Sequence, residues 1–233
     1  MLRGETTMTR RLGSTLSVFV AVFVAVFVAV FMTVVMTVSC GLLNAGLNTV
    51  LAQANDPAAA RVAGLYGTLL DIMKQAKQLG VQGRFDKLAP VLKSTYDVAA
   101  MSKSAVGPAW DTMQPAQQAA IQEAFGRMMI ATYASRFDDF SGEQLNVTQT
   151  VDQPPGDKLV KTIIMQSNGK PVALNYLMRG KGNDWKVVDV YLDGTISELA
   201  SRRAEFGSIL KSGGADALAA SLRQRGDKLL SGS

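Results

Sequence analysis

The sequence contains no histidine, and its single cysteine, Cys40, lies within an apolar N-terminal segment. Histidine is the usual general base near neutral pH, and histidine and cysteine are the usual ligands of zinc. We therefore expect the rest of the chain to have no Ser-His or Cys-His catalysis, no ordinary zinc site and no disulfide. Charge is sparse as well, since charged residues make up 18% of the chain, the net charge is +5, and the basic residues are scattered. A nucleic-acid-binding surface is clustered and strongly basic, so no nucleic-acid partner is expected.

The first 54 residues have the pattern of an export signal. Arg10 and Arg11 precede an uncharged apolar run at residues 16–38, and an Ala-Gln-Ala motif at residues 52–54 suits signal cleavage. The run is also long enough to span a bilayer, which takes about 20 residues, so an uncleaved anchor is the alternative. Both routes carry the folded part out of the cytoplasm. We expect a periplasmic protein, attached to the inner membrane if the segment is not cleaved.

Periodicity in the remaining chain predicts an α+β domain with a meander of four antiparallel strands between N-terminal and C-terminal helices. Apolar residues recur at helical spacing over residues 57–79, 85–96, 98–105, 115–140, 195–211 and 215–225. Alternation predicts strands at residues 145–151, 159–166, 172–178 and 185–192. Asn168-Gly169 is a strong hairpin signal, and Thr195 with Glu198 forms a capping-box pattern. The chain divides into a signal peptide or anchor (1–54), one folded domain (55–228) and a tail (229–233).

Residues 185–197, with Arg203, Glu205 and Phe206 after them, resemble the hallmark of the MlaC-type family of periplasmic phospholipid-binding proteins, also called the toluene-tolerance auxiliary family. Further pieces follow the order of that family: residues 92–97, Met101-Ser102, Gly107, Trp110, residues 115–118, Tyr133, Phe140, Gly142 and residues 213–218. Together they cover residues 57–225. Within this resemblance, residues 193–199 are more similar to the HpnM branch, which is associated with hopanoid biosynthesis.

The resemblance implies a lipid carrier without catalytic residues or cofactors. It would bind phospholipid or hopanoid chains in an apolar cavity between the sheet and the helices, in an architecture similar to cystatin and NTF2-like folds. It would carry this cargo between two partners, the inner-membrane lipid-binding ring protein of an ABC transporter and an outer-membrane lipoprotein complex. Such a carrier needs a dry cavity because each methylene exposed to water costs about 0.8 kcal/mol.

Candidate lining residues are the apolar side chains expected on the helix and strand faces that meet between the two layers. Val188 is placed on the lining face of the fourth strand and Val187 on the opposite face. Ile163 and Met165 are placed on the lining face of the second strand, opposite Ile164. Methionine suits such a lining because its side chain is unbranched and adaptable. The lipid-binding candidates are Leu69, Met73, Phe125, Met128, Met129, Tyr133, Phe137, Ile163, Met165, Leu174, Tyr176, Met178, Val188 and Val190.

Two other functions remain open from the sequence. The first is an NTF2-like enzyme acting on an apolar substrate, for which Asp189, Tyr191 and Tyr176 are the candidate catalytic residues. The second is an envelope interaction module that carries no lipid, which predicts a filled core. A cavity would favour the carrier over the module, and a polar cluster inside it would favour the enzyme. Asp189 itself is expected to pair with Arg202 or Arg203, or to face water.

Overall fold

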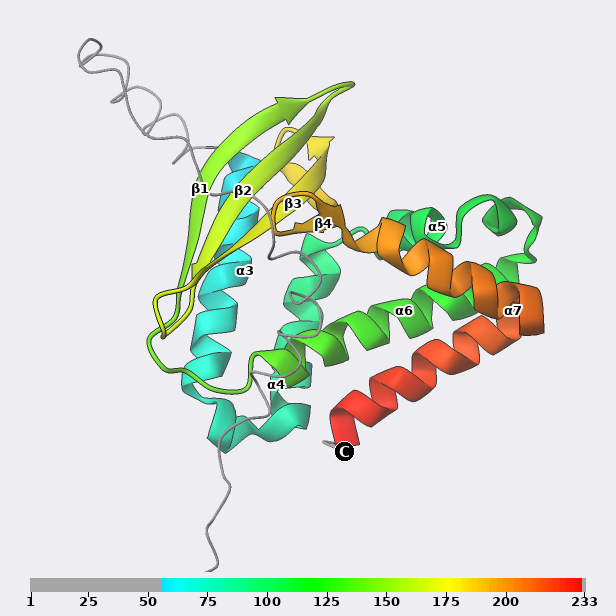
Figure 1. Cartoon of the computed structure of the whole chain (residues 1–233), viewed down its shortest axis with the longest axis horizontal. Helices are drawn as coiled ribbons and strands as arrows, with labels where there is room; N and C mark the ends of the chain where they lie inside the picture. The colour runs from blue at the N-terminus through cyan, green and yellow to red at the C-terminus, as the bar shows by residue number, and fades with distance from the viewer. Residues whose placement is uncertain (1–55, 232–233) are drawn as a thin grey trace, which may run out of the picture. The chain divides into compact units, whose positions relative to one another are not determined.

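The structure, a computed structural model, describes residues 56–231, so the predicted export segment lies outside the described residues. The N-terminal helices (Figure 1) are α3 (Pro57–Lys74), α4 (Ala76–Thr95), α5 (Val98–Val106), the 3-10 helix η1 (Gly107–Thr112) and α6 (Pro115–Arg136). The strands are β1 (Gln144–Gln153), β2 (Asp157–Met165), β3 (Pro171–Lys181), β4 (Asp184–Leu192) and β5 (Ile196–Ser197), and α7 (Glu198–Ser231) follows them. The predicted α+β class is confirmed, with a fifth, two-residue strand beyond the four that were predicted.

Helix starts and breaks follow local sequence chemistry. The Asp56 carboxylate caps α3 by accepting hydrogen bonds from the backbone N–H groups of Ala58 and Ala59 at 2.9 and 3.1 Å, which satisfies donors that the first turn leaves free. Gly80 interrupts α4 with φ of +61°, and Gly214 interrupts α7 with φ of +71°. Only glycine enters this region readily, so kinks fall between the predicted helices 57–79 and 85–96 and between 195–211 and 215–225. The predicted end of the first helix is wrong, because α3 already ends at Lys74 and α4 continues through Gly80.

The sheet is an antiparallel meander in the order β1-β2-β3-β4-β5. Val160 on β2 lies opposite Tyr176 on β3, and Tyr176 lies opposite Val190 on β4. Facing partners in an antiparallel pair point to the same side, so these three side chains define the helix-facing side of the sheet. A register shift between Leu177 and Met178 adds one residue to β4 and reverses its alternation at Val188.

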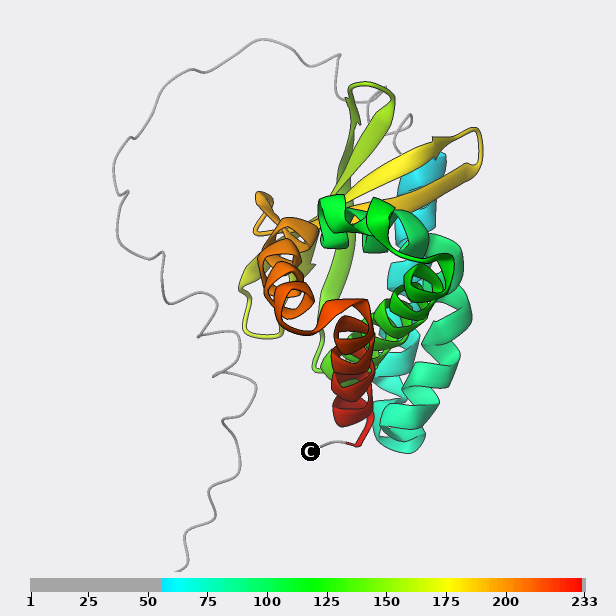
Figure 2. The same ribbon diagram turned by 90° about the vertical axis from the view of Figure 1, so that its right-hand side faces the viewer.

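Helices cover one side of this sheet, as the two ribbon views show (Figures 1 and 2). Helix α3 contacts β1, β2 and β4, while α6 packs along α7. The backbone N–H of Asp97, between α4 and α5, donates to the carbonyl of Val187 on β4 at 2.9 Å. This bond docks the end of α4 on the sheet and brings the adjacent Tyr96 into the interior. Within residues 56–231, every helix is too short or too polar to cross a membrane.

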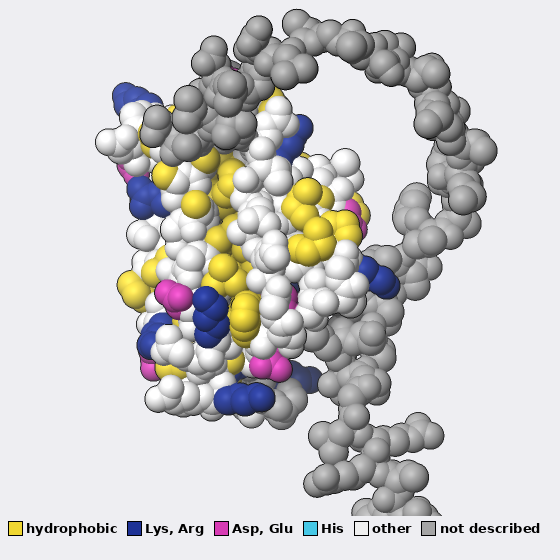
Figure 3. Space-filling model, turned by 90° about the vertical axis from the view of Figure 1, so that its left-hand side faces the viewer, with side chains coloured by type: hydrophobic (Ala, Val, Ile, Leu, Met, Phe, Trp, Pro, Cys, Tyr) yellow, Lys and Arg dark blue, Asp and Glu magenta, His cyan; other side chains and the backbone are white. Residues whose placement is uncertain are grey.

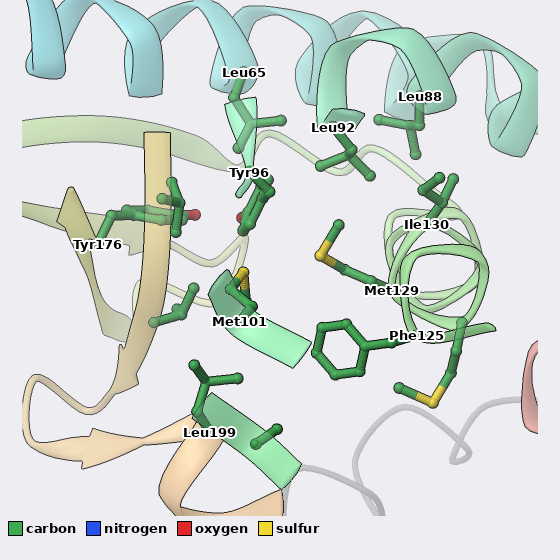
Figure 4. Packing of buried hydrophobic residues seen from close by; sticks show 14 of the residues in the cluster. Leu65, Leu88, Leu92, Tyr96, Met101, Phe125, Met129, Ile130, Tyr176 and Leu199 are labelled. Atoms are coloured by element: carbon green, nitrogen blue, oxygen red, sulfur yellow. The ribbon is translucent and has the colours of Figure 1, made fainter. Parts of the chain in front are cut away.

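A single apolar cluster fills the space between the two layers (Figure 4). It draws Leu65 and Leu69 from α3, Leu92 from α4 and Phe206 from α7, all of which are buried. The rings of Phe206 and Phe125 meet edge to face with centroids 6.2 Å apart, a preferred geometry for aromatic pairs. The core thus joins all the helical segments to one side of the sheet.

Candidate functional site

Most of the predicted lining side chains converge on this core. The ten that belong to the cluster or pack against it are Leu69, Phe125, Met128, Met129, Tyr133, Phe137, Leu174, Tyr176, Met178 and Val190. They come from α3, α6, β3 and β4, which are distant in sequence. Met73, near the end of α3, is buried but lies outside the cluster.

Two predicted residues on β2 lie on the other side of the sheet. Val160 and Thr162 are buried on the helix-facing side, and Ile164 packs against the core. Because side chains alternate along a strand, Ile163 and Met165 point away from the helices, where they are half-buried. Their placement in the cavity lining is therefore wrong. The adjacent isoleucines at positions 163 and 164 gave no indication of which one faces inward.

The bulge on β4 corrects a second assignment. Val187 lies opposite Met178 and is fully buried in the core, although it was predicted to face away. Val188 is buried instead beside Asp189 and Leu199, in a small pocket of about 170 Å³ on the opposite side of β4. One inserted residue reverses the alternation, and nothing in the run of valines indicated the insertion.

Four of the five tyrosines meet at the centre of the core. The rings of Tyr66 and Tyr176 pack edge to face with centroids 5.9 Å apart, and those of Tyr96 and Tyr133 do so at 6.0 Å. The hydroxyls of Tyr96 and Tyr133 share a hydrogen bond, and the Tyr66 hydroxyl lies 2.5 Å from Thr162 Oγ1. In Figure 4 the hydroxyl end of Tyr176 points towards Tyr96. We call Tyr66, Tyr96, Tyr133 and Tyr176 the tyrosine cluster.

Burial raises the pKa of all four hydroxyls, which carry their hydrogen at neutral pH. Loss of water raises the pKa of Tyr66 from its ordinary value of 10.0 to about 12. Burial also raises the pKa of Tyr96 and Tyr176 well above that value, and their tyrosine neighbours add to the rise. The pKa of Tyr133 is raised by burial as well. Each phenol in the cluster therefore retains one hydrogen to donate at neutral pH.

Not all of those hydrogens find an acceptor. Thr162 donates to the carbonyl of Leu174, so the shared bond with Thr162 must use the hydrogen of Tyr66. One hydroxyl of the Tyr96–Tyr133 pair donates its hydrogen to the other. The hydrogen of the accepting hydroxyl is not used in this bond. Across residues 56–231, the fully buried Tyr176 hydroxyl has no hydrogen-bond partner. Burying an unsatisfied polar group costs about 1–3 kcal/mol. A phenylalanine would fill the same space without this cost, so the hydroxyl of Tyr176 is not explained by core packing alone.

An open groove of about 720 Å³ lies between α3, α4 and the turn that joins β3 to β4. Leu65 and Thr95, both buried, form part of its lining, and Arg61 and Asn183 stand beside them. Leu65 also belongs to the apolar core, so the groove reaches the core surface. On the face in Figure 3, apolar side chains are exposed as a strip and as a separate patch beside it. Ile196 is the one large apolar side chain in residues 56–231 that is exposed, at 51%.

The residues proposed for an enzyme do not assemble. Asp189 accepts hydrogen bonds from the Ser197 hydroxyl at 2.6 Å and from the backbone N–H of Leu199 at 3.3 Å. It lies opposite Leu177, on the other side of the sheet from Tyr176. Asp189 therefore fixes the start of α7 and does not join the tyrosines in a polar site.

The start of α7 also differs from the predicted capping box. The Ser197 hydroxyl, and not that of Thr195, accepts from a backbone N–H of the first turn, that of Ala200 at 3.0 Å. Arg202 pairs with Glu198 at 2.5 Å, and Arg203 donates to the carbonyl of Ser104. The expected pairing of Asp189 with either arginine is wrong, because the serine hydroxyl and the free N–H groups of the helix already occupy the carboxylate.

Sequence reasoning missed part of the polar centre. Tyr66 was visible as a member of the apolar stripe of α3, but Tyr96 looked only like the end of a helix. Thr162 gave no signal at all, since a polar residue in an alternating strand is normally assigned to solvent. Its burial depends on hydrogen bonds to partners elsewhere in the fold, Tyr66 and Leu174.

Comparison with known proteins places this geometry in a family. The chain is similar to a phospholipid-binding protein from Ralstonia solanacearum, whose structure was solved in complex with a phospholipid. The two chains are 25% identical with a TM-score of 0.64, over 74% of this chain and 98% of the other. The MlaC protein family matches residues 65–224, which include every described helix and strand in whole or in part. The chain belongs to the MlaC protein family.

Proposed function

We propose that this protein is a periplasmic lipid carrier that holds the apolar chains of one lipid in the core between the sheet and the helices. The observation that carries the proposal is the likeness, over nearly the full length of that relative, to a protein solved with a phospholipid. The convergence of methionine and aromatic side chains from α6, β3 and β4 on one cluster supports the same location.

The physical argument is one of transfer between two apolar environments. A lipid with about 30 methylenes would cost on the order of 20 kcal/mol to expose to water, whereas moving it from a bilayer to a dry core is nearly neutral. Side chains fill the space between the sheet and the helices in the described residues, which is the arrangement expected of a non-carrying interaction module. The likeness to a relative solved with a phospholipid is what favours the carrier, and lipid binding then requires the sheet and the helices to separate and the side chains to repack. Met128, Met129 and Met178 suit that repacking, because methionine adapts its shape at low cost.

The groove between α3 and α4 is the proposed entrance. Its lining includes Leu65, which also belongs to the core, so a chain that enters here meets apolar side chains immediately. Arg61 lies in the same groove, where its guanidinium donates to the carbonyl of Asn183 at 3.3 Å. It places a cation at the entrance for the phosphate of a lipid whose chains point inward.

Family membership supports a further proposal about partners. We propose that the protein exchanges its lipid with an inner-membrane ABC transporter component and with an outer-membrane lipoprotein complex. Hopanoid is the second candidate cargo, because residues 193–199 are similar to the HpnM branch. The export segment, and with it the periplasmic location, stays a prediction, which cell fractionation and N-terminal sequencing of the purified protein would test.

The direct test is the lipid content of the protein. The full chain would be expressed in a Gram-negative host, purified gently and analysed by native mass spectrometry and lipid extraction. About one phospholipid or hopanoid per chain is expected. Met129→Trp, which fills core volume, should reduce the bound lipid at least severalfold, while Met165→Trp on the opposite side of the sheet should not. A wild-type protein that remains free of lipid after incubation with phospholipid vesicles would favour the non-carrying interaction module.

A further inference from the structure

We infer that the tyrosine cluster is a polar contact site for cargo, and that it selects lipids with an uncharged oxygen acceptor, such as an ester carbonyl or a hydroxyl, on the part that enters the core. This inference rests on the proposed carrier function and names the class of lipid. The Tyr176 hydroxyl is fully buried, points towards Tyr96 (Figure 4) and has no hydrogen-bond partner within residues 56–231.

The hydrogens in the cluster define what a ligand must supply. The hydroxyls of Tyr66 and Thr162 are satisfied by each other and by the carbonyl of Leu174. The Tyr176 hydroxyl is unpartnered but lies close to the Tyr96 and Tyr133 hydroxyls. Its oxygen can accept the leftover hydrogen of the Tyr96–Tyr133 pair, which leaves the hydrogen of Tyr176 as the unused one. Phenols with unused hydrogens donate, so the complementary group is a hydrogen-bond acceptor. A chain of methylenes alone would leave this donor unsatisfied.

The acceptor should carry no charge. Arg84 is the only buried cation in the described part of the chain, and it already donates to the carbonyls of Ala76 and Ala134 at 2.9 and 2.7 Å. An anion placed among the tyrosines would lose its hydration without gaining a counter-charge. A phosphate therefore stays outside, and the oxygen that reaches the cluster belongs to an ester linkage or an alcohol.

A structural role and a ligand-binding role predict opposite effects of removing the Tyr176 hydroxyl. If the hydroxyl only supported the fold, Tyr176→Phe would destabilise the protein. Because the hydroxyl is buried and unpartnered, we expect Tyr176→Phe to keep or raise the urea midpoint of the delipidated protein while it weakens binding of an acceptor-bearing lipid. Tyr191→Phe is the matched control, since it removes the same atom from a tyrosine on the opposite side of the sheet.

The experiment compares lipids that differ only in the acceptor. Dissociation constants would be measured for diester and diether phosphatidylglycerol with identical chains, and for a hopanoid alcohol and its parent hydrocarbon. The wild type and Tyr191→Phe should prefer at least one acceptor-bearing member about tenfold, the equivalent of one good hydrogen bond. Tyr176→Phe should reduce that ratio to near one. The preferred pair identifies whether ester or alcohol supplies the oxygen.

Each contrary result has a distinct meaning. Equal binding of both members of both pairs by the wild type would overturn the inference and leave the carrier function intact. A preference that survives in Tyr176→Phe, or a fall in its urea midpoint, would assign the hydroxyl a purely structural role and overturn the inference as well. Failure of the wild type to bind any of the four lipids would instead contradict the carrier function itself.

Discussion

On β2, neighbouring residues show how the two faces of the sheet differ. Thr162 points into the core and is almost completely buried, while Ile163 and Met165 point away from the helices and stay half-buried. The face with more apolar residues on this strand is thus the outer one, and the hydroxyl lies inside. Hydrogen bonds to Tyr66 and Leu174 make that burial possible. The interior of this protein therefore contains a polar centre, formed by Thr162 and the tyrosine hydroxyls. The substitutions and pH changes below test how the two faces of the sheet differ.

The largest difference in unfolding free energy should be between variants of two methionines, one on each face of the sheet. Met178→Ala removes a fully buried side chain from the core and should lower the free energy of unfolding by about 2–5 kcal/mol. Met165→Ala removes the same atoms from the half-buried outer face and should cost less than about 1 kcal/mol. Urea denaturation of the two variants measures both values. Equal losses would show that the faces do not differ in packing.

Alkaline pH should weaken the core next. The pKa of Tyr66 is 10.0 in an ordinary environment and about 12 when folded, so above pH 10.0 the unfolded chain loses its proton first. The contribution of Tyr66 is complete below that pH and should fall by about 2–3 kcal/mol as the pH rises to about 12, at 1.36 kcal/mol per pKa unit. The raised pKa values of Tyr96, Tyr133 and Tyr176 add to the total loss of stability. Tyr66→Phe should flatten this fall in a series of urea titrations more than Tyr191→Phe, because Tyr191 is only partly buried. A slope that neither variant changes would contradict the pKa assignment.

The buried hydroxyl of Thr162 should contribute a somewhat smaller amount. Thr162→Val keeps the shape but leaves the Tyr66 hydroxyl and the Leu174 carbonyl without their partner, at a cost of about 1–3 kcal/mol. Thr148→Val is the control on β1, where the hydroxyl is exposed and its loss should change the unfolding free energy by less than about 0.5 kcal/mol. Thermal unfolding followed by circular dichroism compares the two. If Thr162→Val left the unfolding free energy unchanged, the hydrogen bonds of Thr162 would not contribute to the stability of the fold.

The smallest effect concerns the edge of the same face. Burial alone would raise the pKa of Asp56, but hydrogen bonds from Lys158 and the start of α3 outweigh it and hold the pKa below 3.8. Because the folded pKa is the lower one, the contribution of this carboxylate is present above pH 3.8 and is lost as the pH falls through the folded pKa. Asp56→Asn keeps a helix cap and should cost about 1 kcal/mol near neutral pH, with the gap closing in acid. A gap that persists in acid would point to a different cause.

Much of the fold could be predicted from the sequence, because hydrophobic periodicity and turn-forming residues are local signals. Helical spacing located the helices, Asn168-Gly169 joined two strands, and Gly80 and Gly214 marked breaks that the structure contains. Resemblance to the MlaC-type family, now confirmed, identified the class of protein from segments spread along the chain. These signals depend on residues close together in sequence.

What could not be predicted depends on long-range pairing. The bulge that turns Val187 into the core in place of Val188 arises from the register of β3 against β4. The sequence of one strand alone does not determine this register. The inward position of Thr162 depends on Tyr66, a residue in α3. The lipid-binding roles of the lining residues remain predictions, since they concern contacts with a molecule outside the chain.

Photocrosslinking would show which face of the sheet a bound lipid touches. The full-length protein would be loaded with a phospholipid whose acyl chain carries a photoreactive diazirine, irradiated, and mapped by peptide mass spectrometry. We expect adducts on core side chains of α6 and β3, including Phe125, Met129 and Met178. Adducts confined to the outer face, at Ile163 and Met165, would contradict it.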